Sequence, residues 1–129
     1  MNLQHSTRTI ALIGASNKSE RPSFGVMQFL LSRGYTVHPV NPGLAGQEIQ
    51  GRRVYASLGD VPAPVDMVDI FRNTEDAAAV IDEAIALKDR LAIKTIWCQL
   101  GVVPVAAGKR AEAAGLNVVM DHCPAIEWR

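Results

Sequence analysis

Residues suited to holding a phosphate group gather near the start of the chain, in the segment "GASNKSERPS" at residues 14–23. Gly14 directly follows an apolar run, and Lys18 and Arg21 come a few residues later, before a helical pattern begins after Ser23. Backbone N–H groups at a helix N-terminus bind anions, and charge-assisted hydrogen bonds from Lys or Arg are the strong ones. The segment therefore predicts a phosphate-binding loop.

Small and polar residues also follow the four other apolar runs of the chain. In an open parallel sheet, ligands bind outside the carboxyl ends of the strands, so these residues are candidates for binding. Amides, hydroxyls and backbone donors are common among them and carboxylates are few, which suits holding an anion better than acid–base catalysis. The residues at the five strand ends are Gly14 to Asn17, Asn41 to Gly43, Phe71 to Asn73, Gln99 to Gly101 and Asp121 to Cys123.

The apolar runs that lead to these residues are nearly continuous instead of alternating with polar positions, which is typical of parallel strands covered on both faces. They lie at residues 9–14, 35–40, 65–71, 93–100 and 117–120. Patterns of helical period lie between them, at residues 24–34, 73–91 and 104–115. We predict an α/β fold: a Rossmann-like doubly wound sheet, mainly parallel, with about five to six strands and helices on both faces.

The segment from Asn41 to Pro64 interrupts this alternation, because it is rich in glycine and proline. We expect turns, one short strand over residues 54–56 and a short helical turn near residues 57–60. A connection of this length in a compact domain is usually functional or contains minor elements of its own.

Composition and charge argue against several classes of function. A chain of 129 residues fits one domain, and its 13 basic and 13 acidic side chains balance, so we expect no nucleic-acid partner. Cys98 and Cys123 belong to no metal-ligand motif, and we expect Cys98 to be buried and Cys123 to be more accessible. The N-terminal residues contain no apolar run long enough for a signal peptide or a membrane span. We therefore expect a cytoplasmic protein with no membrane partner.

A dinucleotide site of the NAD type is one explanation of the first loop. That site requires G-x-G-x-x-G after the first strand and an acidic residue at the end of the second strand. The loop here has one glycine, and the second strand ends in Asn41 and Pro42. The loop is also longer than the NAD version and carries Lys18 and Arg21, so a ligand with more phosphate charge is favoured.

Five blocks of sequence together resemble the stand-alone CoA-binding proteins. They read "IALIGAS…RPS", "VHPVNP", "PVDMVDIFR", "IWCQLGV" and "AGLNVVMDHCPAIE". These proteins are in turn similar to the N-terminal CoA-binding domain of the succinyl-CoA synthetase alpha subunit. The resemblance covers about residues 8 to 127, and it implies one CoA-binding domain over residues 1–129.

The resemblance implies a set of ligand contacts. The synthetase pattern V-x-P-G-K-G-G aligns with "VNPGLAG", so Leu44 stands where the synthetase has lysine, and Lys18, Arg21 or Arg72 supplies that charge. The pattern T-E-G-I-P aligns with "QLGVV", which places Gln99 along the pantetheine arm. The implied binding residues are Gly14, Ala15, Ser16, Lys18, Arg21, Ser23, Val40, Asn41, Pro42, Phe71, Arg72, Gln99 and Gly101.

Two differences from the synthetase indicate whether to expect an enzyme or a binding module. Leu100 replaces the glutamate that the synthetase uses in phosphohistidine chemistry, and 129 residues leave no room for a ligase domain. We expect a module that binds coenzyme A or an acyl-CoA, a small-molecule nucleotide ligand, without catalysis of its own. The alternatives are an NAD(P)-binding oxidoreductase-type domain and the nucleotide-binding subunit of a multi-chain acyl-CoA ligase.

Overall fold

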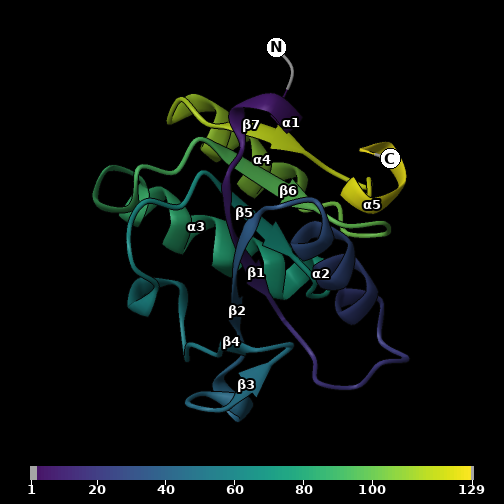
Figure 1. Ribbon diagram of the computed structural model, residues 1–129. Coiled ribbons are helices and arrows are strands. Elements are labelled where there is room, and N and C mark those ends of the chain that lie inside the picture. The colour runs from purple at the N-terminus through teal and green to yellow at the C-terminus, as the bar shows by residue number, and fades with distance from the viewer. Residues whose placement is uncertain (1–2, 129) are drawn as a thin grey trace.

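The computed structural model describes residues 3–128 and contains a five-stranded parallel sheet in the order β2-β1-β5-β6-β7 (Figure 1). Each strand comes from one of the five predicted apolar runs, so the predicted Rossmann-like α/β sheet is confirmed. The strands are β1 (Thr9–Ile13), β2 (Thr36–Val40), β5 (Met67–Ile70), β6 (Thr95–Cys98) and β7 (Asn117–Val119).

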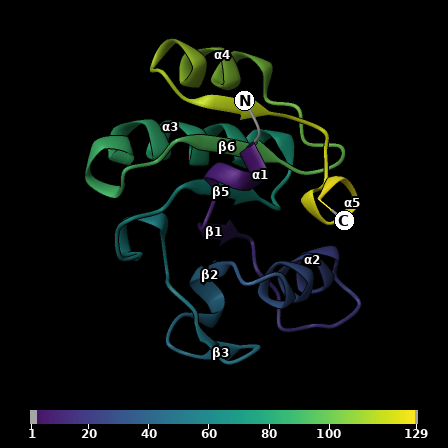
Figure 2. The same cartoon turned by 45° about the horizontal axis from the view of Figure 1, so that its top comes forward.

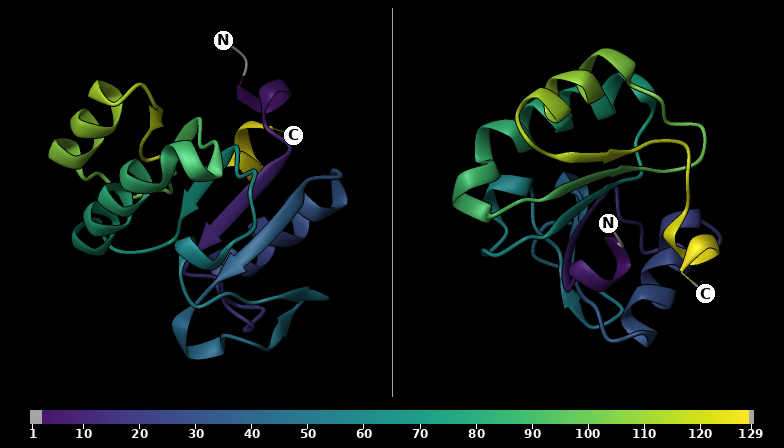
Figure 3. Two further views of the ribbon diagram at one scale, coloured as in Figure 1. Left: turned by 90° about the vertical axis from the view of Figure 1, so that its left-hand side faces the viewer. Right: turned by 90° about the horizontal axis from the view of Figure 1, so that it is seen from above.

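Helices cover both faces of this sheet, as predicted. Figure 2 shows α3 and α4 on one side of the sheet and α2 on the other, and Figure 3 shows α5 beside α2. The helices are α1 (Leu3–Ser6), α2 (Pro22–Ser32), α3 (Thr74–Leu91), α4 (Val105–Ala113) and α5 (Pro124–Glu127). None of the described helices is both long and apolar enough to cross a membrane.

The sheet separates two apolar clusters, and strand β1 contributes to both. Ala11 and Ile13 pack on the side of α3 and α4, whereas Ile10 and Leu12 pack on the side of α2. Successive side chains of a strand point to opposite faces, so a strand buried on both faces must be apolar at every position. This explains the continuous apolar run.

The local sequence explains where α3 begins. The side chain of Asn73 accepts a hydrogen bond from the backbone N–H of Asp76 at 2.7 Å, which caps the helix. Glu75 and Asp76 lie in its first turn, where the helix dipole favours negative charge.

The two other predicted helices form with shifted bounds. Helix α2 begins at Pro22, two residues before the expected start, because proline is well suited to a first helical turn. Helix α4 contains Gly108, which packs so close to β7 that an added Cβ would lie 3.3 Å from Cε of Met120. The glycine that weakens this helix on propensity therefore allows it to approach the sheet.

The segment from Asn41 to Pro64 differs from the prediction in one respect. The short strand expected over residues 54–56 is wrong: the hairpin strands are β3 (Glu48–Ile49) and β4 (Arg52–Arg53), and Tyr55 makes only an isolated bridge to Val40. The turn between them has positive φ at Gln50 and Gly51, as a two-residue hairpin requires. The expected helical turn forms as η2 (Leu58–Asp60), and a second one, η1 (Pro42–Leu44), follows β2.

The last described helix, α5, was not predicted. It brings Trp128 against the ring of Tyr35, with centroids 5.5 Å apart, and edge-on against Trp97 at 5.4 Å. Trp128 is buried by these contacts, so α5 closes the apolar layer on the side of α2.

Candidate ligand-binding site

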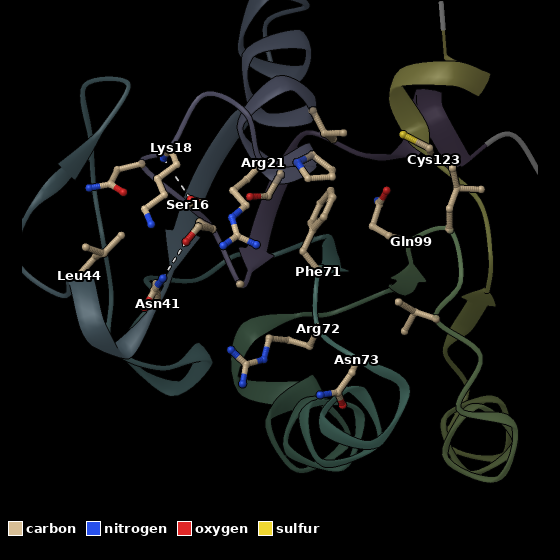
Figure 4. Close-up of a pocket in the computed structure, with 18 of the residues that line it drawn as sticks. Ser16, Lys18, Arg21, Asn41, Leu44, Phe71, Arg72, Asn73, Gln99 and Cys123 are labelled. Carbon is tan, nitrogen blue, oxygen red and sulfur yellow. Dashed lines mark hydrogen bonds between the residues drawn. The ribbon is translucent and has the colours of Figure 1, made fainter.

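A cavity of about 810 Å³ lies outside the carboxyl ends of β1, β2, β5 and β6 (Figure 4). The strand order reverses between β1 and β5, because the chain passes from β1 to β2 on one side and later to β5 on the other. Such a reversal leaves a crevice between the diverging connections, and this is where ligands bind in open α/β sheets.

The structure brings ten of the thirteen predicted residues to the wall of this cavity. They are Gly14, Ala15, Ser16, Lys18, Arg21, Ser23, Asn41, Phe71, Arg72 and Gln99.

The other three predicted residues lie outside the wall. Val40 is buried, and its carbonyl oxygen accepts hydrogen bonds from the N–H groups of Gly14 and Ala15 at 3.0 and 3.2 Å. Pro42 lines a smaller hollow next to the cavity. The N–H of Gly101 donates to Oδ1 of Asp121 at 2.6 Å.

Only glycine fits at position 14. Its φ is +84°, and an added Cβ would overlap the carbonyl oxygen of Phe71 and lie 3.1 Å from Cδ of Arg72. A side chain is strained at this φ and has no space at this approach. Gly14 therefore lets the turn after β5 come directly against the first loop, so that both form one wall.

Asn41 joins the first loop to the turn after β2. Its Nδ2 donates to the carbonyl oxygen of Ala15, and its Oδ1 accepts from the N–H of Gly43, both at 2.8 Å. Because both ends of the carboxamide are engaged by backbone groups, Asn41 shapes the wall of the cavity.

One end of the cavity is cationic, and we call it the charged end. Lys18, Arg21 and Arg72 contribute to it, and the described lining contains no carboxylate. Arg72 pairs with Asp76 at 3.0 Å, both side chains being about half exposed, whereas Lys18 and Arg21 form no ion pair within residues 3–128. Arg21 is also the N-cap residue of α2, so the positive end of the helix dipole lies there too.

At the other end of the cavity the lining residues Gln99, Val102 and Cys123 are at most 8% exposed, and we call this the enclosed end. Figure 4 shows Gln99 and Cys123 there, across the cavity from Lys18. Val26, Leu100 and Val102 add apolar surface to the lining.

Val26 and Val102 could not be assigned to the site from the sequence, since apolar residues outside the strand ends carry no signal of ligand contact, whereas Cys123 is one of the strand-end candidates. Cys123, the N-cap residue of α5, is 8% exposed and Cys98 is fully buried, so Cys123 is the more accessible of the two, as expected, but only slightly. Cys98 is buried, as expected, and burial, followed by the nearby charge of Asp69, raises the pKa of its thiol to about 12.

Beneath the enclosed end lies a buried carboxyl group that the sequence analysis read as part of an apolar strand. Asp69 of β5 is fully buried, and its Oδ1 accepts a hydrogen bond from Nε2 of Gln99 at 2.5 Å. Burial raises the pKa of Asp69 to about 7, although the hydrogen bond from Gln99 acts in the opposite direction. Its Oδ2 has no hydrogen-bond partner among residues 3–128.

The two ends together favour a particular shape of ligand. Three cations and a helix N-terminus favour phosphate, while the enclosed end favours a neutral chain with few polar groups. The arrangement is suited to holding an elongated molecule that is anionic at one end.

Comparisons with known proteins agree with this description. A family model described as "CoA binding domain" matches residues 8–129. The uncharacterized protein YneT of Bacillus subtilis is 32% identical over 121 residues, which are 94% of this chain and 84% of YneT.

Two further relatives show the range of proteins that contain this fold. A solved structure from Thermus thermophilus has 34% identity and a TM-score of 0.89, and the match covers 99% of this chain and 97% of that one. The alpha subunit of the ADP-forming acetate–CoA ligase I of Pyrococcus furiosus is 34% identical over 80 residues, which are 59% of this chain and 17% of that subunit.

Proposed function

The chain belongs to the CoA-binding domain family, and we propose that it binds coenzyme A or an acyl-CoA in the cavity at the strand ends, as one domain without catalysis of its own. The observation that carries this proposal is the pairing of a charged end with an enclosed end in one cavity. CoA carries a pyrophosphate and a 3′-phosphate at one end and a long neutral pantetheine arm at the other, so its two halves match the two ends.

The first loop and the start of α2 hold the phosphates in this proposal. The backbone N–H groups of Ser16 and Ser23 supply neutral donors, since those of Gly14 and Ala15 already donate to Val40, and Lys18 and Arg21 supply charge. Both cations lack a carboxylate partner within residues 3–128, so a phosphate meets no competitor there.

Phe71 and Arg72 form the opposite wall of the charged end and contact the nucleotide in this proposal. Arg72 has to leave Asp76 or share it, which costs little because an exposed ion pair contributes about 0–1 kcal/mol. Val40 and Pro42 act indirectly: Val40 holds the first loop through its carbonyl oxygen, and Pro42 begins the turn that Asn41 ties to that loop.

The absence of catalysis is proposed from the chemistry of the described lining. It offers amides, hydroxyls, cations and one thiol, but no carboxylate or histidine to transfer a proton. Asp69 lies beneath the wall, where it is fully buried.

Calorimetric titration of the purified protein with CoA, dephospho-CoA and NAD tests the proposal. We expect CoA to bind most tightly and dephospho-CoA to bind more weakly, since it lacks the 3′-phosphate. Stronger binding of NAD than of CoA, or no binding of CoA, would refute the proposal, and the first result would favour an NAD(P)-binding oxidoreductase-type domain.

A second candidate function is supported by the similarity to the acetate–CoA ligase alpha subunit. In that case the chain is the nucleotide-binding subunit of a multi-chain acyl-CoA ligase. Affinity purification of the tagged protein from its own cells separates the two: a ligase subunit copurifies with a partner chain that gives nucleotide-dependent acyl-CoA formation, and a stand-alone binding module does not.

A further inference from the structure

A buried polar pair at the enclosed end is left unexplained by phosphate binding. Asp69 lies on the central strand β5, where its neighbours in register are Leu12 of β1 and Trp97 of β6. Burying a carboxyl group among such side chains is costly, and the single hydrogen bond from Gln99 offsets only part of that cost. A more stable core would place an apolar residue at position 69, so the pair calls for an explanation outside stability.

The contact with Asp69 fixes the orientation of the Gln99 side chain. Above its pKa of about 7, Asp69 is a carboxylate that accepts hydrogen bonds and cannot donate them, so it faces the NH₂ group of the carboxamide. The opposite orientation would bring Oε1 of Gln99 against Oδ1 of Asp69, two acceptors at hydrogen-bond distance. Oε1 therefore points away from Asp69.

The oxygen of Gln99 that points away from Asp69 is open to the cavity. The Gln99 side chain lines the cavity although the residue is only 6% exposed, and Oε1 accepts no hydrogen bond from any residue within 3–128. Among these residues the only fully enclosed side-chain nitrogen or oxygen without a partner is Oδ2 of Asp69, so Oε1 of Gln99 is not sealed off. Figure 4 shows the carboxamide between Cys123 and Phe71, inside the cavity.

We propose that Asp69 is a positioning residue that holds the carbonyl oxygen of Gln99 toward the cavity, where it accepts a hydrogen bond from an amide N–H in the arm of the ligand. This inference rests on the proposed CoA function and adds to it that the enclosed end selects a hydrogen-bond donor in the arm of the ligand. A nearly buried carbonyl oxygen needs a strong donor once a ligand displaces water, because a buried acceptor without a hydrogen bond is costly.

An amide N–H suits this position better than a thiol. The pantetheine arm of CoA contains two amide groups and ends in a thiol, and an S–H group is a weak donor. A ligand whose arm offers only acceptors leaves two oxygens facing each other, so the pair rejects it. The selectivity of the enclosed end is therefore for a donor in the arm, independent of the phosphates.

The test compares two ligands and three variants. CoA contains the arm, whereas adenosine 3′,5′-bisphosphate presents nucleotide phosphates without it. Gln99→Met removes the acceptor at similar size, Asp69→Leu removes the positioning group, and the third variant combines both changes. Affinities are measured at pH 8.5, where Asp69, with a pKa of about 7, is ionised.

We expect each single variant to bind CoA about 5- to 30-fold more weakly than the wild type, and the bisphosphate within about twofold of it. The double variant should bind CoA no more weakly than Gln99→Met alone, because Asp69 acts only through Gln99. If Asp69 had a purely structural role, its loss would weaken CoA binding in the Gln99→Met background as well. Val68→Ala, a buried change on the other face of β5, is the matched control and should leave CoA affinity unchanged.

Several outcomes would overturn the inference while the CoA function stands. Unchanged CoA affinity in Asp69→Leu, equal losses for both ligands, or additive losses in the double variant each contradict it. A wild-type preference for CoA over acetyl-CoA that Gln99→Met abolishes would assign the contact to the thiol instead of an amide N–H. If the wild type binds no CoA at all, the proposed function itself fails. Asp69→Leu removes a buried carboxyl group that has one hydrogen bond and one oxygen without a partner within residues 3–128, so we expect it to fold, which a thermal melt checks.

Discussion

The charged end and the enclosed end of the cavity hold their polar groups in opposite ways. Lys18, Arg21 and Arg72 are exposed and reach the cavity on long side chains, and one of them already has a partner in Asp76. Asp69 and Gln99 are buried and locked to each other. Exposed cations contribute attraction that salt weakens, while a buried pair contributes a directional requirement that salt barely affects. Under the proposed function, affinity and selectivity therefore depend on different ends of the cavity.

The largest effect concerns the pH dependence of stability, which the enclosed end alone should produce. The native state raises the pKa of Asp69 to about 7, above its unfolded value near 3.9, so the native state binds more protons between these values. Stability contributed by the neutral form is complete below about pH 4 and is lost as the pH rises through 7. Because the pKa of Asp69 is about 7 in the native state and near 3.9 in the unfolded state, the free energy of unfolding should fall by about 4 kcal/mol.

Urea denaturation of the wild type and Asp69→Leu at a series of pH values measures this effect. The difference in the free energy of unfolding between the two proteins should change by about 4 kcal/mol between pH 4 and pH 8. Arg110 and Asp82, which pair far from the cavity, supply a control in Asp82→Ala, whose difference from the wild type should not follow this profile. A pH-independent difference for Asp69→Leu would mean that Asp69 is ionised in the native state over this whole pH range.

The next largest effect is expected at Gly14, which lies where the first loop meets the turn after β5 and so affects the whole cavity. Gly14→Ala should lower the free energy of unfolding by about 3 kcal/mol and weaken binding of both CoA and adenosine 3′,5′-bisphosphate, because the new Cβ displaces Phe71 and the loop together. Chemical denaturation and calorimetry measure the two effects.

Gly34→Ala is the matched control for this change. Gly34 has a similar positive φ of +88°, but an added Cβ would meet nothing within 4 Å. We expect it to cost about 1 kcal/mol and to leave binding intact. Equal effects at Gly14 and Gly34 would show that φ alone, and not the close approach to Phe71, makes Gly14 necessary.

A smaller effect is expected at the charged end. Arg21→Ala should weaken CoA binding by about 1.5–3 kcal/mol, the range for hydrogen bonds to charged groups, and should weaken adenosine 3′,5′-bisphosphate equally. Calorimetry at low and high salt should show the difference between wild type and variant shrinking as salt rises. Unchanged CoA affinity at low salt would remove Arg21 from the site.

The smallest effect is expected for Asp76, which pairs with Arg72 and so competes with a ligand phosphate for it. Asp76→Ala frees the guanidinium and should strengthen CoA binding by about 0.5 kcal/mol. It also removes the carboxylate next to the α3 cap, so the thermal melt should be slightly lower. Asp82→Ala breaks an exposed ion pair on the same helix away from the cavity and should not change affinity. Weaker binding in Asp76→Ala would mean that Asp76 positions Arg72 instead of competing for it.

The sheet and the charged end could be predicted because both leave local signals. Strands buried on both faces need apolar residues at every position, and the first loop carries its glycine and cations within a few residues. Asp69 could not be singled out within the run "VDMVDIF", because no local pattern indicates that a polar strand residue is buried without a full set of hydrogen-bond partners. The same holds for Cys123, which is buried only through its place in the apolar cluster on the side of α2.

The hairpin after β2 shows the same limit at the level of fold. Residues 54–56 have the composition of a strand, but the residues that pair are Glu48 with Arg53 and Ile49 with Arg52. Their register follows from the turn between them, where Gln50 and Gly51 have positive φ. Glutamine rarely adopts such a conformation, so the tertiary contacts of this segment decide the turn. One of these contacts is the hydrogen bond from Nε2 of Gln50 to the carbonyl oxygen of Phe24 on α2.

The concentration of cations at one mouth of the cavity has a kinetic consequence under the proposed function. The chain is neutral overall, with 13 basic and 13 acidic side chains, so its long-range field is weak and the local field at Lys18, Arg21 and Arg72 guides an approaching anion. The association rate constant should then fall with ionic strength, while the dissociation rate constant follows the contacts of the arm. Capture and residence time are therefore set by different residues and can evolve separately.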